Sequence, residues 1–388
     1  MSYKKLGEFI QVVDDRNKEL LDIPLLGVSV QKVFIPSIAN TVGTDMSKYK
    51  ILSRNEFTYI PDTSRRGDKI GVALLKSYDK ALVSQAYTTF KIIDENQLNP
   101  DYLMMWFTRP EFDRYARYHS IGSVREVFDW EDMCNVELPV PSIEKQREIV
   151  AQYQAVENKI KVNEQICEKL EATAQTLYKQ WFVDFEFPFD FAQGKPNEEG
   201  QPYKSSGGAM VFNEDLEKEI PEGWEVGKLS DLITVKYGKD YKHLNKGNIP
   251  LYGSGGIMSF VDEILYDKPS VLIPRKGSLN NILYIKTPFW SVDTMFYTIP
   301  KIDNTLIYVF NVLSKMDFNS LNVGSAVPSM TTEYLNSMQI LIPENNVLKP
   351  FDIELNQLED YKISIIKQNQ KLTQLQSLLL SRLATLEG

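Results

Sequence analysis

Cysteine and histidine are scarce in this sequence of 388 residues. The chain has two of each, Cys134, Cys167, His119 and His243, and no CxxC pair. So few soft ligands argue against a structural zinc site, and such cysteine usage is typical of a reducing cytoplasm. No run of about 18 apolar residues occurs, and no apolar segment follows the N-terminal residues, so we expect neither a membrane span nor a secretion signal.

Motifs that mark self-sufficient enzymes are absent as well. The sequence has no GxxxxGK(S/T) loop for ATP and no GxGxxG loop that opens a helix after a strand. It lacks a Pro-Pro dipeptide, and therefore the (D/N/S)PP(Y/F) motif of amino-methyltransferases, and it has no PD…(D/E)xK nuclease pattern. His119 and His243 fall at non-equivalent places in the two halves of the chain. We therefore predict no catalytic residue and no metal site.

The net charge of −9 argues by itself against a nucleic-acid partner. However, the segment from Asp184 to Glu225 contains eleven acidic residues and three lysines, and so carries most of this charge. The rest of the chain is close to neutral and can present local basic faces, on which phosphate contact depends. Charge therefore neither supports nor excludes a DNA partner.

The sequence repeats itself with a period near 200 residues. At an offset of 202, Gly122-Ser123 aligns with Gly324-Ser325. Nearer the start of each half, Ile23–Gly27 resembles Ile249–Gly253 at a slightly larger offset. We therefore predict two similar lobes that differ by loop insertions.

Each half ends in a long apolar repeat with steps of three and four residues. A sustained seam of this kind is typical of a coiled coil, although for one helix alone core packing is the simpler interpretation. Two matched helices of roughly 35–40 residues, about 55 Å long, favour a spacer. Polar Asn163 and Asn369 lie in the seam, where a buried amide costs stability but can fix register. The predicted seam comprises Ile149, Tyr153, Val156, Ile160, Asn163, Leu170, Leu177, Trp181, Phe351, Leu355, Leu358, Ile365, Asn369, Leu372, Leu379 and Leu383.

Mixed patterning before each long helix predicts α+β lobes. β-rich runs and turn residues alternate there, and two helical stretches interrupt them. The predicted strands lie within Lys69–Leu75, Ala81–Ile93, Ser270–Pro274 and Thr294–Ile299, and the predicted helices are Tyr102–Tyr118 and Leu306–Met316. The expected domains are a first lobe at 1–140, a first helix at 141–185, an acidic, turn-rich linker at 186–219, a second lobe at 220–342 and a second helix at 343–388.

Four stretches carry a family resemblance. Leu138–Ile149 (LPVPSIEKQREI) and Tyr178–Phe185 (YKQWFVDF) are similar to the start and end of a conserved central helix. Ile220–Glu225 (IPEGWE) and Tyr252–Gly256 (YGSGG) are similar to openings of a target-recognition domain. On these motifs the chain, over nearly its whole length, resembles HsdS, the specificity subunit of type I restriction–modification systems.

The resemblance implies two target-recognition domains joined by two conserved helices that pair antiparallel, with a pseudo-twofold relation between the halves. Each domain would read one half of a divided site in double-stranded DNA. The helices would set the gap and dock two modification subunits, and through them the restriction subunits that drive translocation. It also implies no catalysis and no bound cofactor in this chain. The partners would use S-adenosylmethionine for adenine N6 methylation, and ATP and Mg for cleavage, in the cytoplasm.

The chain departs from the family pattern at two places. The first lobe lacks a Pro-Glu-Gly-Trp opening and begins almost at once with Lys5-Leu6-Gly7. The second proline segment, Pro343–Val347, has lost the Glu-Lys-Gln run that follows Ile143. The sequence therefore does not predict equal docking strength at the two ends.

Candidate DNA-reading residues lie in turn-rich loops of both lobes. Arg pairs with guanine, and Asn or Gln with adenine, in the major groove, whereas cations near turns suit phosphates. Each residue taken alone has the alternative of a solvated turn. The candidates are Arg65, Arg66, Gln85, Ser123 and Arg125 in the first lobe, and Lys239, Tyr241, Lys242, Ser254, Gly255, Arg275, Lys276, Ser278, Asn280 and Asn281 in the second.

Two other functions stay open at this point. The chain could be a coiled-coil adaptor whose two lobes bind protein or carbohydrate instead of DNA. It could also be a nuclease or methyltransferase with unrecognised motifs. The bases read do not follow from sequence, because groove contacts depend on loop conformation and DNA shape.

Overall fold

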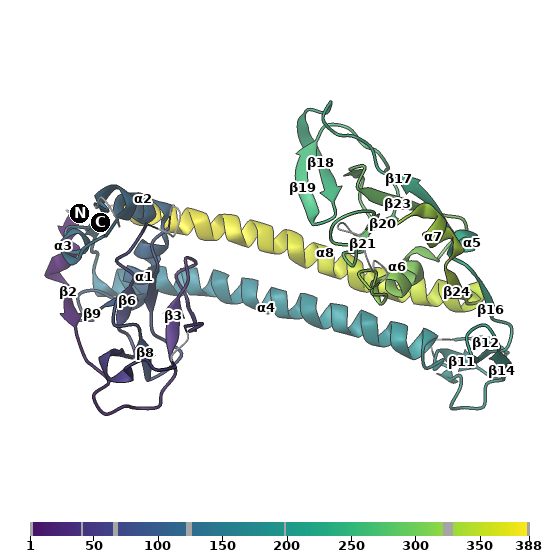
Figure 1. Ribbon diagram of the computed structural model, residues 1–388, viewed down its shortest axis with the longest axis horizontal. Helices are drawn as coiled ribbons and strands as arrows, with labels where there is room; N and C mark the ends of the chain where they lie inside the picture. Colours follow the sequence, from purple (N-terminus) through teal and green to yellow (C-terminus); the bar gives the residue numbers. More distant parts are fainter. Residues whose placement is uncertain are drawn as a thin grey trace. The chain divides into compact units, whose positions relative to one another are not determined.

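The computed structural model describes residues 3–39, 42–64, 69–121, 126–197, 199–320 and 329–385. The chain forms two units: unit 1 contains Met1–Glu164 and Lys367–Gly388, and unit 2 contains Gln165–Ile366. Each unit combines one lobe with part of both long helices, α4 (Ile143–Phe182) and α8 (Asn345–Arg382), as labelled in Figure 1. Within these described ranges, no helix is long and apolar enough to cross a membrane.

Lobe 1, in unit 1, is an α+β domain. Its main sheet has the strand order β2-β9-β6-β7, and smaller sheets pair β1 with β10, β3 with β4, and β5 with β8. The elements are β1 (Tyr3–Lys5), η1 (Leu6–Glu8), β2 (Ile10–Val13), β3 (Leu26–Val28), β4 (Phe34–Pro36), η2 (Met46–Lys48), β5 (Lys50–Ser53), β6 (Phe57–Tyr59), β7 (Val72–Leu74), β8 (Lys80–Val83), β9 (Thr88–Ile92), α1 (Pro100–Thr108), α2 (Pro110–His119), α3 (Trp130–Cys134) and β10 (Glu137–Pro139).

Lobe 2, in unit 2, repeats this plan. Its main sheet has the order β17-β23-β20-β21, β16 pairs with β24, and a third sheet has the order β19-β18-β22. The elements are β16 (Glu225–Lys228), α5 (Leu229–Leu232), β17 (Ile233–Tyr237), β18 (Lys246–Gly253), β19 (Gly256–Val261), β20 (Ser270–Pro274), β21 (Leu283–Ile285), β22 (Trp290–Ser291), β23 (Met295–Pro300), α6 (Leu306–Ser314), α7 (Thr332–Ser337) and β24 (Gln339–Ile342).

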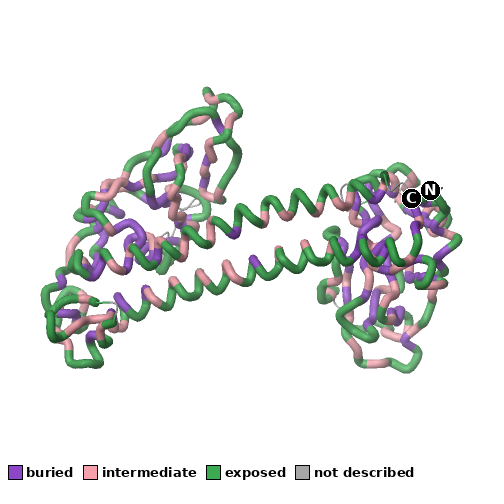
Figure 2. Tube along the Cα trace, turned by 180° about the vertical axis from the view of Figure 1, so that it is seen from behind, coloured by how far each residue is buried: buried purple, intermediate pink, exposed green. Residues whose placement is uncertain are grey.

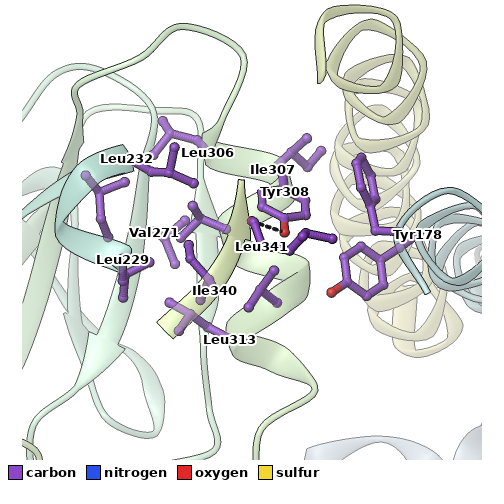
Figure 3. Close-up of a cluster of buried hydrophobic side chains, with 14 of the residues drawn as sticks. Tyr178, Leu229, Leu232, Val271, Leu306, Ile307, Tyr308, Leu313, Ile340 and Leu341 are labelled. Atoms are coloured by element: carbon purple, nitrogen blue, oxygen red, sulfur yellow. Dashed lines mark hydrogen bonds between the residues drawn. The ribbon is translucent and has the colours of Figure 1, made fainter. Parts of the chain in front are cut away.

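The duplication extends to single hydrogen bonds. In lobe 1 the Tyr102 hydroxyl donates to the Pro139 carbonyl at 2.9 Å, and in lobe 2 the Tyr308 hydroxyl donates to the Leu341 carbonyl at 2.7 Å (Figure 3). Burial raises the pKa of both tyrosines above the ordinary range. Each bond ties the helix that follows the main sheet to the strand before the long helix. The internal duplication predicted from the sequence is therefore confirmed.

The two long helices run antiparallel within unit 1. The Asn163 side-chain amide donates to Asn369 Oδ1 at 2.7 Å, and Ile149 shares an apolar cluster with Leu383. From the first of these contacts to the second, the residue number decreases along α4 and increases along α8. The two helices therefore run in opposite directions. α8 ends in a short 3-10 turn, η3 (Leu383–Thr385), that places Leu383 in the core of lobe 1.

Unit 2 has the same antiparallel pairing. Lys362 and Glu171 form an ion pair at 2.7 Å, and the rings of Trp181 and Phe351 have centroids 5.4 Å apart. Every position of the predicted seam is buried or half-buried, whereas most other positions of the two helices are exposed (Figure 2). An apolar stripe that is covered on one side by a partner helix explains why helices of this length are stable.

The core of lobe 2 rests directly on α4. Tyr178 of α4 lies beside Tyr308 of α6, at 6.3 Å between ring centroids (Figure 3). Leu232 of α5, Val271 of β20 and Ile340 of β24 belong to the same buried cluster. The lobe and the helix therefore share one hydrophobic core, which fixes the lobe on the helix.

Two predicted elements of lobe 1 are interrupted in the structure. The helix predicted over Tyr102–Tyr118 is split at Arg109 into α1 and α2, because Pro110 disfavours a helical conformation at the preceding residue. The strand predicted over Ala81–Ile93 is split into β8 and β9 by a turn, in which the Tyr87 N–H donates to the Ser84 carbonyl. Each segment was predicted as one continuous element and forms two. The predictions were wrong because local turn chemistry overrides the apolar pattern.

The segment 186–219, which we expected to be a turn-rich linker, contains short strands as well as turns. Phe187 stacks between Tyr203 and Trp224, with ring centroids 4.6 and 5.4 Å away. This aromatic stack joins the segment to the hydrophobic core of lobe 2. Its strands are β11 (Pro188–Asp190), β12 (Lys195–Pro196), β13 (Gln201–Pro202), β14 (Met210–Asn213) and β15 (Lys218–Pro221).

Candidate nucleic-acid interface

Four loops of lobe 2 that are distant in sequence come together at one place. The Asn281 side-chain amide donates to the Ser254 carbonyl at 2.8 Å and so joins the loop after β20 to the turn between β18 and β19. The Arg275 N–H donates to the Thr294 carbonyl at 2.8 Å, and this joins the loop after β20 to the segment before β23. The Lys239 N–H donates to the Ser291 carbonyl at 2.9 Å and adds the loop after β17.

Two glycines permit this convergence. A Cβ at Gly238 would lie 2.1 Å from the Val292 carbonyl oxygen, so the two backbones touch where a side chain would separate them. Gly277 has a φ of +87°, and a Cβ there would lie 2.6 Å from the Ser254 hydroxyl. Only glycine combines a left-handed conformation with so close an approach at low cost.

Arg275 is held from two sides. Its guanidinium lies over the Tyr237 ring, 5.4 Å from the centroid, and one nitrogen donates to the Asp293 carbonyl at 3.4 Å. The carbonyl contact uses one of the five N–H donors of a guanidinium. A half-buried arginine stacked on a ring is pre-organised for a planar, two-pronged acceptor such as a guanine edge or a phosphate.

The two neighbouring asparagines hold the loop in shape. Asn280 donates to the Asp317 carboxylate at 2.9 Å and accepts from the Phe318 N–H at 2.8 Å. The hydrogen bond from Asn280 lowers the pKa of Asp317. Since Asn281 donates to Ser254, both amides, which the sequence predicted as base readers, already make contacts within the lobe.

The other predicted residues of lobe 2 lie on the surface of the same loops. Tyr241 is half-buried and packs against the apolar cluster that contains Trp290, whose ring N–H donates to the Lys239 carbonyl at 3.2 Å. Acidic groups interrupt the basic surface, for example Asp240, which is also exposed. Five predicted residues are exposed there: Lys239, Lys242, Gly255, Lys276 and Ser278.

Lobe 1 presents a different surface at the equivalent place. Gln85 is exposed in the turn between β8 and β9. An isolated bridge pairs Asp62 with Val127, as another pairs Lys276 with Ser329, so an acid in lobe 1 stands where lobe 2 has a cation. Four predicted residues, Arg65, Arg66, Ser123 and Arg125, lie outside the described residues.

Sequence reasoning missed two features of this interface. Tyr237, two residues before the predicted Lys239, was not selected, although an aromatic beside lysines is a usual nucleic-acid pattern. The hairpin of β18 and β19 was selected only for its turn, yet Ile257, Met258 and Phe260 are 55%, 54% and 47% exposed. Ile257 and Met258 are neighbours in sequence and both are exposed, which departs from ordinary alternation in a strand, and the sequence shows them only as part of an apolar stretch that Ser259 interrupts.

Gln146, in the family-like stretch before α4, is fully buried. Its Oε1 accepts from the Asn99 N–H at 2.8 Å, and its Nε2 donates to the carbonyls of Gln97 and Pro141 at 2.9 and 2.8 Å. The equivalent residue at an offset of 202 is Leu348, which is 1% exposed in the core of lobe 2. The difference between the two proline segments thus lies in how each long helix is attached to its own lobe.

A groove occurs twice, once in each unit, beside the helix that follows the main sheet. In unit 1 its volume is about 460 Å³ and α1 and α4 border it; in unit 2 it is about 240 Å³ and α6, α4 and α8 border it. Glu157 of α4 and Glu359 of α8 occupy equivalent positions in the two linings. When Tyr102 is aligned with Tyr308, four further positions match: Asp101, Met104, Met105 and Thr108 in α1, and Ile307, Phe310, Asn311 and Ser314 in α6.

In the part of the chain that the structure describes, no group of three or more His, Cys, Asp or Glu residues could hold a metal ion. Cys134 and Cys167 are both half-buried. The chemistry available at the candidate interface is therefore that of hydrogen bonding, stacking and charge. Such a set of groups suits recognition of a nucleic acid.

Comparison with known proteins agrees with this geometry. The family model of the type I restriction modification DNA specificity domain matches residues 4–172 and 221–376, one stretch in each half of the duplication. The type I restriction enzyme MjaIX specificity subunit of Methanocaldococcus jannaschii is 28% identical over 329 residues, which are 75% of this chain and 70% of that protein. The type I restriction enzyme HindI specificity subunit of Haemophilus influenzae is 21% identical over 364 residues, which are 76% of this chain and 79% of that protein.

A solved structure has the same fold. The crystal structure of the type I restriction–modification system S subunit from M. genitalium covers 100% of this chain and 96% of its own, with a TM-score of 0.61. Its sequence is 16% identical, so the similarity concerns the fold alone.

Proposed function

Because the chain belongs to the type I restriction–modification DNA specificity family, we propose that each of its two lobes reads one half of a divided site in double-stranded DNA. Members of this family are DNA sequence-recognition subunits, which are in general non-catalytic. The observation that carries the proposal is the convergence of four loops of lobe 2 around Arg275. The duplication supplies the second reader, whose surface differs in charge where Asp62 stands at the place of Lys276.

In this proposal the roles within lobe 2 divide by chemistry. Arg275 reads a guanine edge, because its stacked guanidinium can donate two parallel hydrogen bonds to O6 and N7. Exposed Lys239, Lys242 and Lys276 contact phosphates and set the register of the lobe on the duplex. Asn280 and Asn281 shape the loop that presents Arg275.

An Arg275→Ala variant tests the proposal. In the complex reconstituted with its modification subunits, we expect cognate binding to weaken about tenfold, the cost of one lost bidentate base contact. Lys268→Ala is the matched control, since it removes one exposed positive charge before the other end of β20. Binding to cognate and random duplexes is measured by fluorescence anisotropy at physiological salt. Equal cognate affinity of the variant and the wild type would contradict the role of Arg275.

We propose further that the duplicated groove docks two copies of one modification subunit, and that restriction subunits join through them. A partner that binds twice needs an equivalent surface twice, and the two grooves are lined at four equivalent positions of α1 and α6, of which Met104 with Phe310 and Thr108 with Ser314 are also similar in kind. S-adenosylmethionine, ATP and Mg are then used by the partners, and the assembly works in the cytoplasm. Met104→Lys and Phe310→Lys should each reduce the number of bound modification subunits from two to one in native mass spectrometry. Two bound copies with either variant would argue against the groove.

A further inference from the structure

The hairpin of β18 and β19 exposes an unusual amount of apolar surface. Ile257, Met258 and Phe260 are about half exposed, and all three lie on β19, the edge strand of its sheet. Single exposed apolar residues need no explanation, but a group of them next to polar side chains marks a surface that binds something.

A β-bulge sets the position of Met258. Tyr252 pairs with Ile257 and Leu251 pairs with Ser259, so Met258 is the extra residue between two paired positions. Bulges redirect a side chain and are frequent next to functional sites. The Met258 side chain lies over Gly253, where a Cβ would be 2.4 Å from its sulfur. The missing side chain at Gly253 therefore makes room for Met258 beside the turn.

The same turn belongs to the candidate interface. Ser254 follows Gly253 and accepts the hydrogen bond from Asn281, so Met258 lies next to the loop that carries Arg275. Exposed Lys246 begins β18 of the same hairpin, and exposed Lys242 lies in the loop before it. Asp262 just beyond β19 is bound by the Asn245 amide, which lowers the pKa of this carboxyl. The apolar group is thus continuous with a polar surface that includes cations.

We propose that Met258 recognises the 5-methyl group of a thymine in the major groove of the second half-site. Among the four bases only thymine presents a methyl group there, and it is read by apolar contact. Phe260 and Ile257 exclude water from that contact by covering its sides. The inference rests on the proposed function of lobe 2, and it adds an apolar reader to the polar one at Arg275.

Lobe 1 differs at this point. Its corresponding hairpin, β3 and β4, begins within the Ile23–Gly27 stretch that matches Ile249–Gly253, and its exposed aliphatic residues, Val33 and Ile35, line the groove of unit 1. The thymine contact is therefore argued for lobe 2 alone.

Deoxyuridine substitution tests the proposal, because it removes the methyl group of a thymine and nothing else. The site is first identified by methylome sequencing of a host that carries the complex. Each thymine of the second half-site is then replaced in turn, and binding of the reconstituted complex is measured. We expect wild-type binding to weaken about fourfold at one position, the effect of one buried methyl group. Met258→Ala should bind thymine and deoxyuridine duplexes equally, whereas Ile264→Ala, an exposed control beyond β19, should keep the difference.

The outcomes separate this inference from the proposed function. If Arg275→Ala weakens binding but no deoxyuridine substitution does, the methyl reading is wrong and the reading by lobe 2 stands. A second half-site without thymine, or a Met258→Ala variant that still distinguishes thymine from deoxyuridine, also overturns it. If Met258→Ala weakens binding to the thymine duplex and to the deoxyuridine duplex by the same factor relative to the wild type, Met258 acts as a wedge between base pairs and the methyl contact is wrong. If neither Arg275→Ala nor any base change in this half-site alters binding, the proposed function itself fails.

Discussion

Gln146 and Leu348 begin the two long helices at equivalent positions, yet they attach them to their lobes by opposite chemistry. Gln146 satisfies one backbone N–H and two carbonyls in a buried place. Leu348 fills the same place in unit 2 with an apolar side chain. A buried side-chain amide is tolerated when all its hydrogen-bond partners are present. A buried apolar side chain is tolerated when the surrounding backbone groups need no hydrogen bond from it.

Exchanging these residues should harm both units. Gln146→Leu leaves three backbone groups of unit 1 without their partner, and we expect the free energy of unfolding to fall by about 2 kcal/mol. Leu348→Gln places an amide among apolar side chains and should cost a similar amount in unit 2. Urea denaturation measures the loss, and hydrogen exchange assigns it to one unit. Gln152→Leu, at an exposed position of α4, is the control. An unchanged unfolding midpoint for Gln146→Leu would show that its hydrogen bonds contribute nothing.

At the candidate interface, sequence reasoning found which residues would meet but not what each would do. Turn chemistry and charge selected Arg275 and Asn280 together, since both residue types read bases. The structure engages Asn280 with Asp317 and Phe318, which lie 37 and 38 residues away. No local pattern encodes such a tertiary contact. The same holds for the Tyr237 ring under Arg275.

The helix pair is the element that sequence predicted best, because its stabilisation repeats at regular intervals. Apolar residues at steps of three and four must share one face of a helix, and a face of this length needs a long partner. The break at Pro110 and the strands of 186–219 were missed. Those strands depend on the stacking of Phe187 between Tyr203 and Trp224, residues that are 16 and 37 positions away and lie among turn formers.

The amide pair in the helix seam gives a prediction at this scale. Asn163→Leu removes the donor to Asn369 and Gln368, so we expect the free energy of unfolding to decrease by about 1–2 kcal/mol. The double variant Asn163→Leu with Asn369→Leu should recover this loss and exceed the wild type, because two leucines pack in a seam where one amide left alone does not. Chemical denaturation of both variants and of Lys161→Leu, an exposed control, checks the order. A single variant more stable than the wild type would contradict it.

For the whole molecule, the proposed role of the long helices as a spacer predicts a change in the DNA site. Insertion of seven residues after both Gln165 and Lys367 adds about 10 Å to each helix at the division between the units. We expect the gap between the half-sites to lengthen by up to about three base pairs, while both half-sites keep their sequence. Methylome sequencing reads the new gap directly. The same insertion in α8 alone is the control, since it mismatches the helix pair and should abolish modification. An unaltered gap after the double insertion would remove the spacer role.

Unit 1 is built from two separate pieces of chain, whereas unit 2 is continuous in sequence. The core of lobe 1 includes Leu383, and the Tyr3 hydroxyl donates to the Ala384 carbonyl at 2.7 Å. During synthesis on the ribosome, all residues of lobe 2 are therefore present before the C-terminal segment that completes the core of lobe 1. A stop codon just after Ile366 should consequently spare lobe 2 and leave the lobe that was translated first more sensitive to proteases, so damage from a late nonsense mutation appears at the opposite end of the gene product.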